Sequence, residues 1–342
     1  QCEDQVIFME LTPMLPNVKI LATGGTIAGS ANSSTQMTNY EPGVLKVEDL
    51  LAAVPEVADY AHITAEQVSN LGSHDIDDAF WLLLAEKCRQ SLASPNIDGL
   101  VLTHGTNTLE ETAYFLNLVV NSHKPVVVVG SMRPGTAVSA DGPLNLLNAV
   151  RLAGNRQAAG RGVLIALNDQ INGARDTSKT NTSNTGTFRA PDLGLLGYMI
   201  NGEAVFYRAT TRKHTAAAEF EIGPLAALPQ VEIIYGHANQ NRVLVDAAVN
   251  SGAQGIVYAG MGMGAIHKNA APALIEAQKK GVVVVRGSRT GSGIVPFDSK
   301  WTQECHFVDA DNLNPQKARI LLMLALTKTN DYQEIQRMFG EY

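Results

Sequence analysis

Two threonines stand in segments that directly follow short apolar runs of the sequence. Thr26 lies in the glycine-rich segment 23–29 after the run Val18–Ala22, and Thr106 lies in a short segment after the run Gly99–Leu102. A threonine hydroxyl becomes a nucleophile when a neighbouring base takes its proton. In open α/β sheets, ligands bind beyond the carboxyl ends of the strands, where both threonines are expected. Both residues are therefore expected to face a ligand at this edge of the sheet.

Lys179 is the candidate base for such a hydroxyl, because burial lowers the proton affinity of a lysine and leaves it able to accept a proton. Taken alone, a lysine among polar residues is more often a solvated surface residue, and both threonines could simply satisfy the hydrogen bonds of their turns. The segment 23–29 lacks the spacing of a dinucleotide-binding fingerprint and the Gly-Lys-Ser/Thr ending of a phosphate loop. Nucleotide binding is therefore disfavoured.

The elements that must position these residues alternate along the chain. Apolar runs predict strands at Val18–Ala22, Gly99–Leu102, Val126–Val129, Gly162–Leu167, Val231–Tyr235, Gly255–Tyr258 and Val282–Val285. Helical spacing of apolar residues predicts helices at Asp77–Leu92, Thr108–Val120, Leu144–Leu152, Ala270–Lys280 and Gln316–Leu326. Thr108 and Glu111 have the spacing of a capping box, which predicts a helix start there. Continuous apolar strands alternating with helices favour a doubly wound α/β fold.

The length of 342 residues favours two domains. The alternating pattern breaks into a polar stretch between Tyr207 and Leu228. We therefore predict an N-terminal domain over 1–212, a linker over 213–228 and a smaller C-terminal α/β domain over 229–342. The larger domain is expected to carry the doubly wound sheet.

Composition excludes several classes of protein. The formal net charge is -7 and Lys and Arg form no stripe, so nucleic acid binding is disfavoured. The apolar runs are far shorter than the roughly 20 residues that span a bilayer, so no membrane span is predicted. Cys2, Cys88 and Cys305 show no CxxC spacing, and neither a metal site nor a cofactor is expected. The initial Gln1 suggests a processed or trimmed chain.

Several longer motifs occur in order along the chain. They are Thr-Gly-Gly-Thr-Ile-Ala-Gly at 23–29, Gly-Ser-x-Asp at 72–75, His-Gly-Thr-x-Thr-x-Glu-Glu-Thr-Ala-Tyr-Phe-Leu at 104–116, Met-Arg-Pro at 132–134, Ser-Ala-Asp-Gly-Pro at 139–143, Lys-Thr-Asn at 179–181 and Leu-Asn-Pro-Gln-Lys-Ala-Arg at 313–319. With these motifs, the chain resembles the type II bacterial L-asparaginases and glutaminase-asparaginases. The resemblance runs from about Asn17 to Tyr342.

This resemblance implies a two-step displacement. The Thr26 hydroxyl attacks the side-chain amide carbon, ammonia leaves, and water hydrolyses the acyl-enzyme. Tyr40 occupies the position of a lid tyrosine that polarises Thr26 and closes the site. Thr106 and Lys179 match a second cluster that activates water or assists the nucleophile, and backbone N–H groups near Thr106 are suited to stabilising the oxyanion.

The resemblance also implies an amino-acid substrate. Ser73 matches the residue that binds the substrate α-carboxylate, and His74 stands where the family often has glutamine or glutamate. Ser131 stands where a small residue offers its carbonyl to the substrate amide. Asn107 replaces the family's aspartate, which would bind the α-ammonium and pair with Lys179, so we predict weakened catalysis.

The family assembles as a homotetramer whose active sites are shared between subunits. By resemblance, Asn239 would reach into a neighbouring subunit's site, and Asp298 is the nearest candidate for a further acidic contact. Resemblance to type II members favours a periplasmic or secreted location over a cytoplasmic one. Hydrolysis of asparagine, with glutamine as a lesser or comparable substrate, is the leading hypothesis. The alternatives are an impaired or engineered homologue that binds asparagine or aspartate because of Asn107, and a cytosolic dinucleotide-binding protein.

Overall fold

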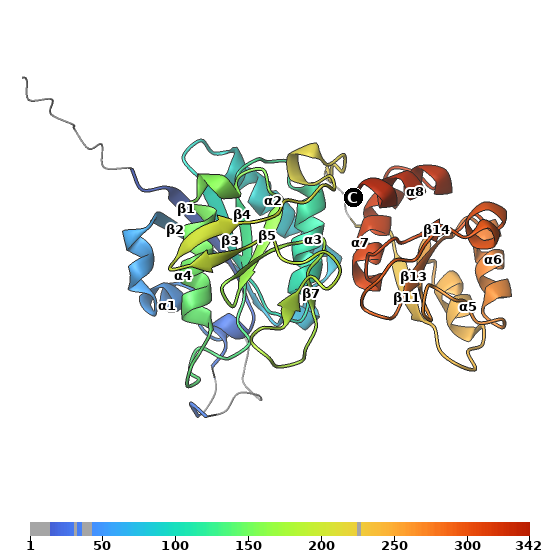
Figure 1. Ribbon diagram of the computed structural model, residues 1–342, viewed down its shortest axis with the longest axis horizontal. Coiled ribbons are helices and arrows are strands. Elements are labelled where there is room, and N and C mark those ends of the chain that lie inside the picture. Colours follow the sequence, from blue (N-terminus) through green and yellow to red (C-terminus); the bar gives the residue numbers. More distant parts are fainter. Residues whose placement is uncertain (1–13, 31–32, 36–42, 224–226) are drawn as a thin grey trace, which may run out of the picture.

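The computed structural model describes residues 14–30, 33–35, 43–223 and 227–342, which form two α/β parts that lie side by side (Figure 1). The larger part contains the strands β1 (Asn17–Gly24), β2 (His62–Leu71), β3 (Gly99–Thr103), β4 (Val126–Val129), β5 (Val163–Leu167), β6 (Gln170–Gly173), β7 (Ser178–Lys179), β8 (Phe188–Arg189), β9 (Gly197–Ile200) and β10 (Glu203–Phe206). Its α-helices are α1 (Val47–Ala52), α2 (Asp78–Ala93), α3 (Leu109–Val119) and α4 (Gly142–Ala153).

The main sheet of the larger part has eight strands in the order β10-β9-β6-β5-β4-β3-β1-β2. Strands β2, β1, β3, β4 and β5 are parallel, whereas β6, β9 and β10 extend the sheet with antiparallel pairs. Helices α2 and α3 pack on one face, and α1 and α4 pack on the other. The fold predicted from the sequence is confirmed, with an antiparallel edge that the apolar runs did not indicate.

The smaller part contains β11 (Val231–Tyr235), β12 (Gly255–Gly260), β13 (Val283–Ser288) and β14 (Val308–Asp309), together with α5 (Val243–Asn250), α6 (Ala271–Lys279), α7 (Pro315–Leu326) and α8 (Tyr332–Glu341). Its sheet is entirely parallel, in the order β11-β12-β13-β14. Helices α5 and α6 cover one face, and α7 and α8 cover the other. This arrangement buries both faces of the sheet, as expected for parallel strands.

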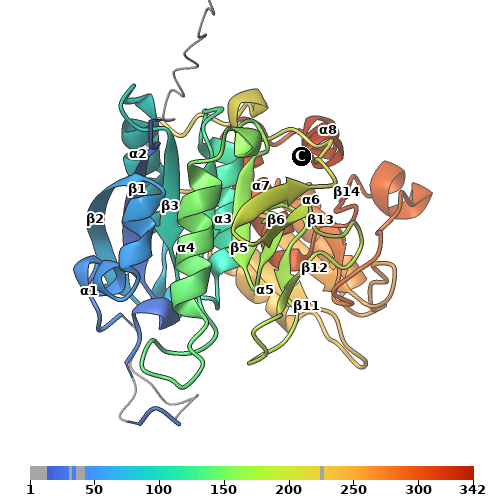
Figure 2. The same cartoon turned by 60° about the vertical axis from the view of Figure 1, so that its left-hand side comes forward.

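Helix α7 joins the two parts. It packs on β12 of its own sheet and on α3 of the larger part, and Figure 2 shows α7 beside α3 from a second direction. Apolar residues of α3 and α7 belong to one continuous buried cluster, which contains Tyr114, Phe115, Leu321 and Leu322. The start of α7 therefore lies against the region that follows β3, where Thr106 stands.

Candidate active site

The turns that carry Thr26 and Thr106 lie backbone against backbone. They follow β1 and β3, which are neighbouring parallel strands paired through Ala22 and Thr103. Gly25 has a φ of 82°, and a Cβ atom placed on it would lie 2.2 Å from the Gly105 Cα atom. Only glycine allows this approach. The adjacent glycines of the first motif thus bring the two threonine turns together.

Ser73 is the third member of this cluster. It begins a short 3-10 helix, Ser73–Asp75, and its side chain is buried. The backbone N–H of Asn107 donates to Ser73 Oγ at 3.2 Å, and Thr108 Oγ1 donates to the Ser73 carbonyl at 2.6 Å. A Cβ atom on Gly105 would lie 2.6 Å from Ser73 Oγ. The segment around Ser73 is therefore fixed directly to the Thr106 turn.

The bond from Thr108 corrects one prediction. Helix α3 begins at Leu109 with Thr108 as its N-cap residue, as the sequence indicated, but the Thr108 side chain makes no capping hydrogen bond. Its hydroxyl donates to Ser73 instead. The backbone N–H of Glu111 donates to the Thr108 carbonyl oxygen at 3.1 Å and not to its side chain, so the predicted side-chain capping box does not form.

Lys179 completes the cluster from the short strand β7, which pairs antiparallel with β8. Its Nζ donates to Thr106 Oγ1 at 2.9 Å and to Asn107 Oδ1 at 3.1 Å. Burial lowers the pKa of Lys179 below its usual value, while the negative charge of Glu110 acts in the opposite direction. A lysine with a lowered pKa beside a threonine hydroxyl is suited to proton transfer.

Glu110 was not singled out from the sequence. Its buried carboxylate accepts a hydrogen bond from the Lys179 backbone N–H and two more from the side chains of Asn314 and Gln316 in the C-terminal part. The sequence shows Glu110 only as an acidic residue four positions after Thr106. Its partners lie about two hundred residues away, at separations of 204 and 206, and sequence spacing could not reveal them.

The two parts of the chain match two family models. Residues 17–212 match "Asparaginase, N-terminal", and residues 230–339 match "Glutaminase/Asparaginase C-terminal domain". The chain belongs to the asparaginase family. It is 53% identical over 328 residues to L-asparaginase 2 of Bacillus subtilis, covering 96% of this chain and 87% of that protein. It is 45% identical over 336 residues to the glutaminase-asparaginase of Pseudomonas fluorescens, covering 98% and 92%.

A solved structure of the family has the same fold. The crystal structure of the probable cytoplasmic L-asparaginase from Campylobacter jejuni matches with a TM-score of 0.94 and 47% identity. The match covers 96% of this chain and 100% of that chain. The resemblance drawn from the motifs is thus confirmed by whole-chain similarity.

Ser131 lies at the end of β4, close to the Thr106 turn. The backbone of Gly130 packs against that turn, and a Cβ atom on Gly130 would lie 3.2 Å from Thr106 Cγ2. The Ser131 side chain is buried and donates to the Arg133 carbonyl at 2.7 Å. Its hydroxyl is therefore engaged within its own loop, which leaves the backbone as the part of Ser131 suited to a ligand.

His104 is fully buried and directly follows β3. Burial lowers its pKa to about 4, and its Nδ1 lies 2.7 Å from the Gly105 carbonyl. The imidazole is therefore neutral at physiological pH, with the proton on Nδ1. His104 shapes the turn and is not suited to act as a general acid at neutral pH.

His74 and Tyr40 are the remaining candidates from the N-terminal part of the chain. His74 is exposed, its ring packs over Gly72, and its Nε2 lies 3.4 Å from Asp75 Oδ2. Tyr40 falls outside the residues that the structure describes.

Asn239 and Asp298 belong to loops of the C-terminal part. Asn239 is exposed in a tight turn after β11, with a φ of 58°. Asp298 caps the helical turn Ser299–Glu304, where its carboxylate accepts from the backbone N–H groups of Lys300 and Trp301. Across the described residues, no hydrogen bond links either side chain to Thr106 or Lys179.

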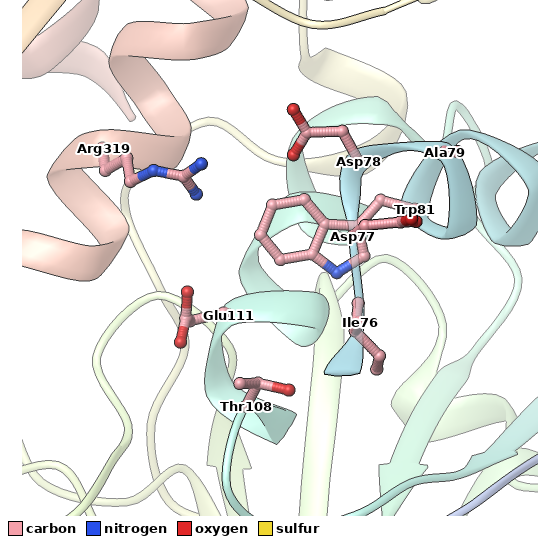
Figure 3. A pocket seen from close by; sticks show the side chains of 8 residues that line it. All are labelled: Ile76, Asp77, Asp78, Ala79, Trp81, Thr108, Glu111 and Arg319. Carbon is pink, nitrogen blue, oxygen red and sulfur yellow. The ribbon is translucent and has the colours of Figure 1, made fainter. Parts of the chain in front are cut away.

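A cavity of about 460 Å³ lies behind this cluster, between α2, α3 and α7 (Figure 3). Figure 3 shows the Arg319 guanidinium pointing toward the carboxylates of Asp78 and Glu111, with the Trp81 ring beside them. Burial, with the neighbouring charge of Glu110, raises the pKa of Glu111 to about 7. Thr108 lines this cavity and also contacts Ser73, so the cavity and the cluster share a wall.

Within the described ranges, no group of three or more His, Cys, Asp or Glu side chains is arranged to hold a metal ion. In the same part of the chain, no helix is long and apolar enough to cross a membrane.

Proposed function

We propose that the chain is an amidohydrolase that converts L-asparagine to L-aspartate and ammonia, with L-glutamine as a second substrate. Its relatives include proteins named L-asparaginase and glutaminase-asparaginase. The observation that carries the proposal is the 2.9 Å hydrogen bond between Lys179 and Thr106, beside the turn that presents Thr26.

In the proposed reaction, the Thr26 hydroxyl oxygen attacks the amide carbon and forms a tetrahedral intermediate. The hydroxyl proton passes to the amide nitrogen, which leaves as ammonia, so the first step gives an ester between Thr26 and the substrate acyl group. Water then attacks this ester and releases aspartate. Tyr40 is proposed to polarise Thr26 in the first step, and backbone N–H groups near Thr106 are proposed to stabilise the oxyanion.

Thr106 and Lys179 are proposed to activate the attacking water or to assist the nucleophile. The neutral amine of Lys179 takes a proton through Thr106 Oγ1, which lies within hydrogen-bond distance. Because burial lowers the pKa of Lys179, the neutral form is available at lower pH than for an exposed lysine. Catalysis should therefore rise as pH rises through the pKa of Lys179.

The substrate's charged groups are proposed to bind at the other side of the cluster. Ser73 is suited to the α-carboxylate and Asn107 Oδ1 to the α-ammonium, while the Ser131 carbonyl accepts the amide N–H. His74 follows Ser73 directly and is proposed to tune the preference between asparagine and glutamine. One methylene changes such a preference by only about 1 to 3 kcal/mol.

We further propose that the protein works as a homotetramer in which Asn239 and Asp298 complete the site of a neighbouring subunit. Their exposed or half-buried places in loops of the C-terminal part support this arrangement. A periplasmic or secreted location is proposed as well. The relative from Haemophilus influenzae is named a probable periplasmic L-asparaginase, whereas the Campylobacter jejuni protein is named cytoplasmic.

The alternative of an impaired homologue gains no support from the relatives, which are named as enzymes over nearly the whole length of this chain. The dinucleotide-binding alternative rested on fold and glycine turns alone. Those turns pack against each other in this structure.

Ammonia release from asparagine and from glutamine tests the proposal. We expect release from asparagine, and with hydroxylamine present we expect the β-aspartyl hydroxamate, because a second nucleophile intercepts an acyl-enzyme. Thr26→Ala should abolish both products. Aspartate binding by calorimetry without any ammonia release would favour the impaired homologue instead.

A further inference from the structure

The lysine of the cluster is held from behind by a buried carboxylate. Glu110 is 3% exposed, and its Oε2 accepts the backbone N–H of Lys179. Its Oε1 accepts Asn314 Nδ2 at 3.0 Å and Gln316 Nε2 at 2.6 Å. Both carboxylate oxygens are therefore occupied, one by the strand that bears the lysine and the other by the start of α7.

The start of α7 also holds the segment before Lys179. Asn314 Nδ2 donates to Ser178 Oγ at 2.9 Å. The fully buried Lys317 donates to the carbonyls of Arg175 and Thr177. Each of these contacts joins the C-terminal part to the short β7 segment. A two-residue strand has little stability of its own, so these contacts fix where β7 lies.

The charges around this network are few. Glu110 is the carboxylate whose charge acts on Lys179, and on the α7 side Lys317 faces Glu110, Glu111, Arg175 and Asp176. Replacing Glu110 with a neutral residue would therefore remove a charge that favours the protonated form of Lys179. A glutamine at this position would present either its carbonyl oxygen, which accepts, or its NH2 group, which donates, to the Lys179 backbone N–H.

We propose that Glu110, held by Asn314 and Gln316 of the C-terminal part, is a positioning residue that sets both the place and the proton affinity of Lys179. This inference rests on the proposed amide hydrolysis. Glu110 touches no reacting atom, and it acts through β7. The C-terminal part thus controls the catalytic cluster of its own chain, separately from any loop offered by a neighbouring subunit.

The adjacent residue provides a matched control. Glu111 lies on the same first turn of α3 but is only partly buried, and it faces the cavity opposite Arg319 (Figure 3). No hydrogen bond connects Glu111 to Lys179 among the described residues. A Glu-to-Gln change at either position replaces a carboxyl group with an amide of the same size, on the same helix, one residue apart.

The test compares wild type, Glu110→Gln, Glu110→Asp and Glu111→Gln as full-length assembled proteins, with ammonia release measured against pH. For Glu110→Gln we expect kcat to fall by roughly 10- to 100-fold, because small misplacements of a catalytic group are costly. KM should stay within about twofold of the wild-type value. The rising limb of the pH profile should move to lower pH by about 1 unit, because a charge that favours the ammonium is gone.

Glu110→Asp keeps the charge and should return the limb to the wild-type pH. Glu111→Gln should keep both kcat and the limb near wild type. Suppose that wild type is active but the rising limb does not move in Glu110→Gln, or moves equally in Glu111→Gln. The inference about Glu110 would then be overturned, while the proposed function would stand. A wild type that releases no ammonia from asparagine or glutamine overturns the proposed function as well.

Gln316→Ala keeps the inference testable if Glu110→Gln does not fold. This change removes one donor to Glu110 and leaves every charge in place. We expect a three- to tenfold fall in kcat, a typical size for the loss of one supporting hydrogen bond of about 1 kcal/mol, with the pH limb unmoved. Wild-type kcat in a folded Gln316→Ala protein contradicts the positioning role.

Discussion

The candidate residues of the two parts of the chain are held in very different ways. Thr26, Ser73 and Thr106 are buried and fixed by backbone contacts, with Lys179 bonded directly to Thr106. Asn239 is exposed, and Asp298 serves as a helix cap. The difference supports the proposal that the reacting groups are assembled within one chain and that the C-terminal loops contribute to the site of a neighbouring subunit.

The change Thr26→Ala is expected to have the largest effect on activity, and it tests whether the N-terminal cluster carries the chemistry. If the N-terminal cluster carries the chemistry, losing the hydroxyl should reduce kcat by at least about 1000-fold. Thr26→Ser keeps a hydroxyl at the same place and should retain activity within about tenfold. Steady-state ammonia release measures both. Comparable activity in Thr26→Ala and wild type would remove Thr26 from the mechanism.

The packing of the two threonine turns is tested next by Gly25→Ala. The added Cβ would meet the Gly105 backbone at 2.2 Å, so the turns must separate. We expect a loss of about 3 kcal/mol in the free energy of unfolding and a roughly 100-fold fall in kcat. Denaturant unfolding and kinetics measure these effects.

Gly160→Ala is the matched control for that change. Gly160 also has a positive φ, of 69°, but a Cβ atom there has no atom within 4 Å. Only the backbone strain of about 1 to 2 kcal/mol should appear, with kcat unchanged. Equal effects at both glycines would show that strain, and not the contact between turns, governs Gly25.

Asn107→Asp tests whether the exposed edge of the cluster lacks a charge. A carboxylate beside the Lys179 ammonium should raise the pKa of Lys179, and the rising limb of the pH profile should move to higher pH. It should also bind the substrate α-ammonium more tightly and raise kcat/KM about tenfold at the optimum pH. Unchanged turnover in Asn107→Asp would refute the prediction that Asn107 weakens catalysis.

Asn155→Asp adds the same charge away from the cluster, at a short 3-10 helix cap that aspartate also satisfies. Its pH profile and kcat/KM should match those of wild type. A tenfold gain in this variant too would point to net charge instead of the Asn107 position.

The smallest effect is expected in the C-terminal loops. Asp298→Asn keeps a side-chain oxygen for the backbone N–H groups of Lys300 and Trp301, so thermal stability should hold. If the carboxylate also serves a neighbouring site, kcat/KM should fall a few-fold, and Asn239→Ala should show a similar fall. Wild-type kinetics in Asp298→Asn would leave that residue with its capping role alone.

The strand ends were predictable from sequence because buried parallel strands are continuously apolar. All residues of β3, β4 and β5 are buried, and each begins and ends within about one residue of its predicted run. Strand β2 was missed because all of its residues are partly or fully exposed at the edge of the sheet. Its pairing with β1 depends on that neighbour more than on its own pattern.

Residue types and strand ends indicated Thr26 and Thr106, but Lys179 became a firm candidate only through the family resemblance. The hydrogen bond from Thr108 to Ser73 and the three bonds to Glu110 join segments far apart in sequence. Local spacing suggested a capping box for Thr108, whereas in the structure its hydroxyl donates to the Ser73 carbonyl. The partner that a threonine hydroxyl takes depends on tertiary contacts that local spacing does not encode.

The contacts between the Glu110 region and the start of α7 have a consequence for the order in which the protein folds during its synthesis. Ser178 and Asn314 are 136 residues apart, and at about 5 to 20 residues per second a ribosome needs roughly 7 to 27 seconds to cover that distance. During this interval β7, which bears Lys179, has been synthesised, but Asn314 and Gln316 have not. The contacts that Asn314 and Gln316 make with Ser178 and Glu110 can therefore form only when synthesis is nearly finished.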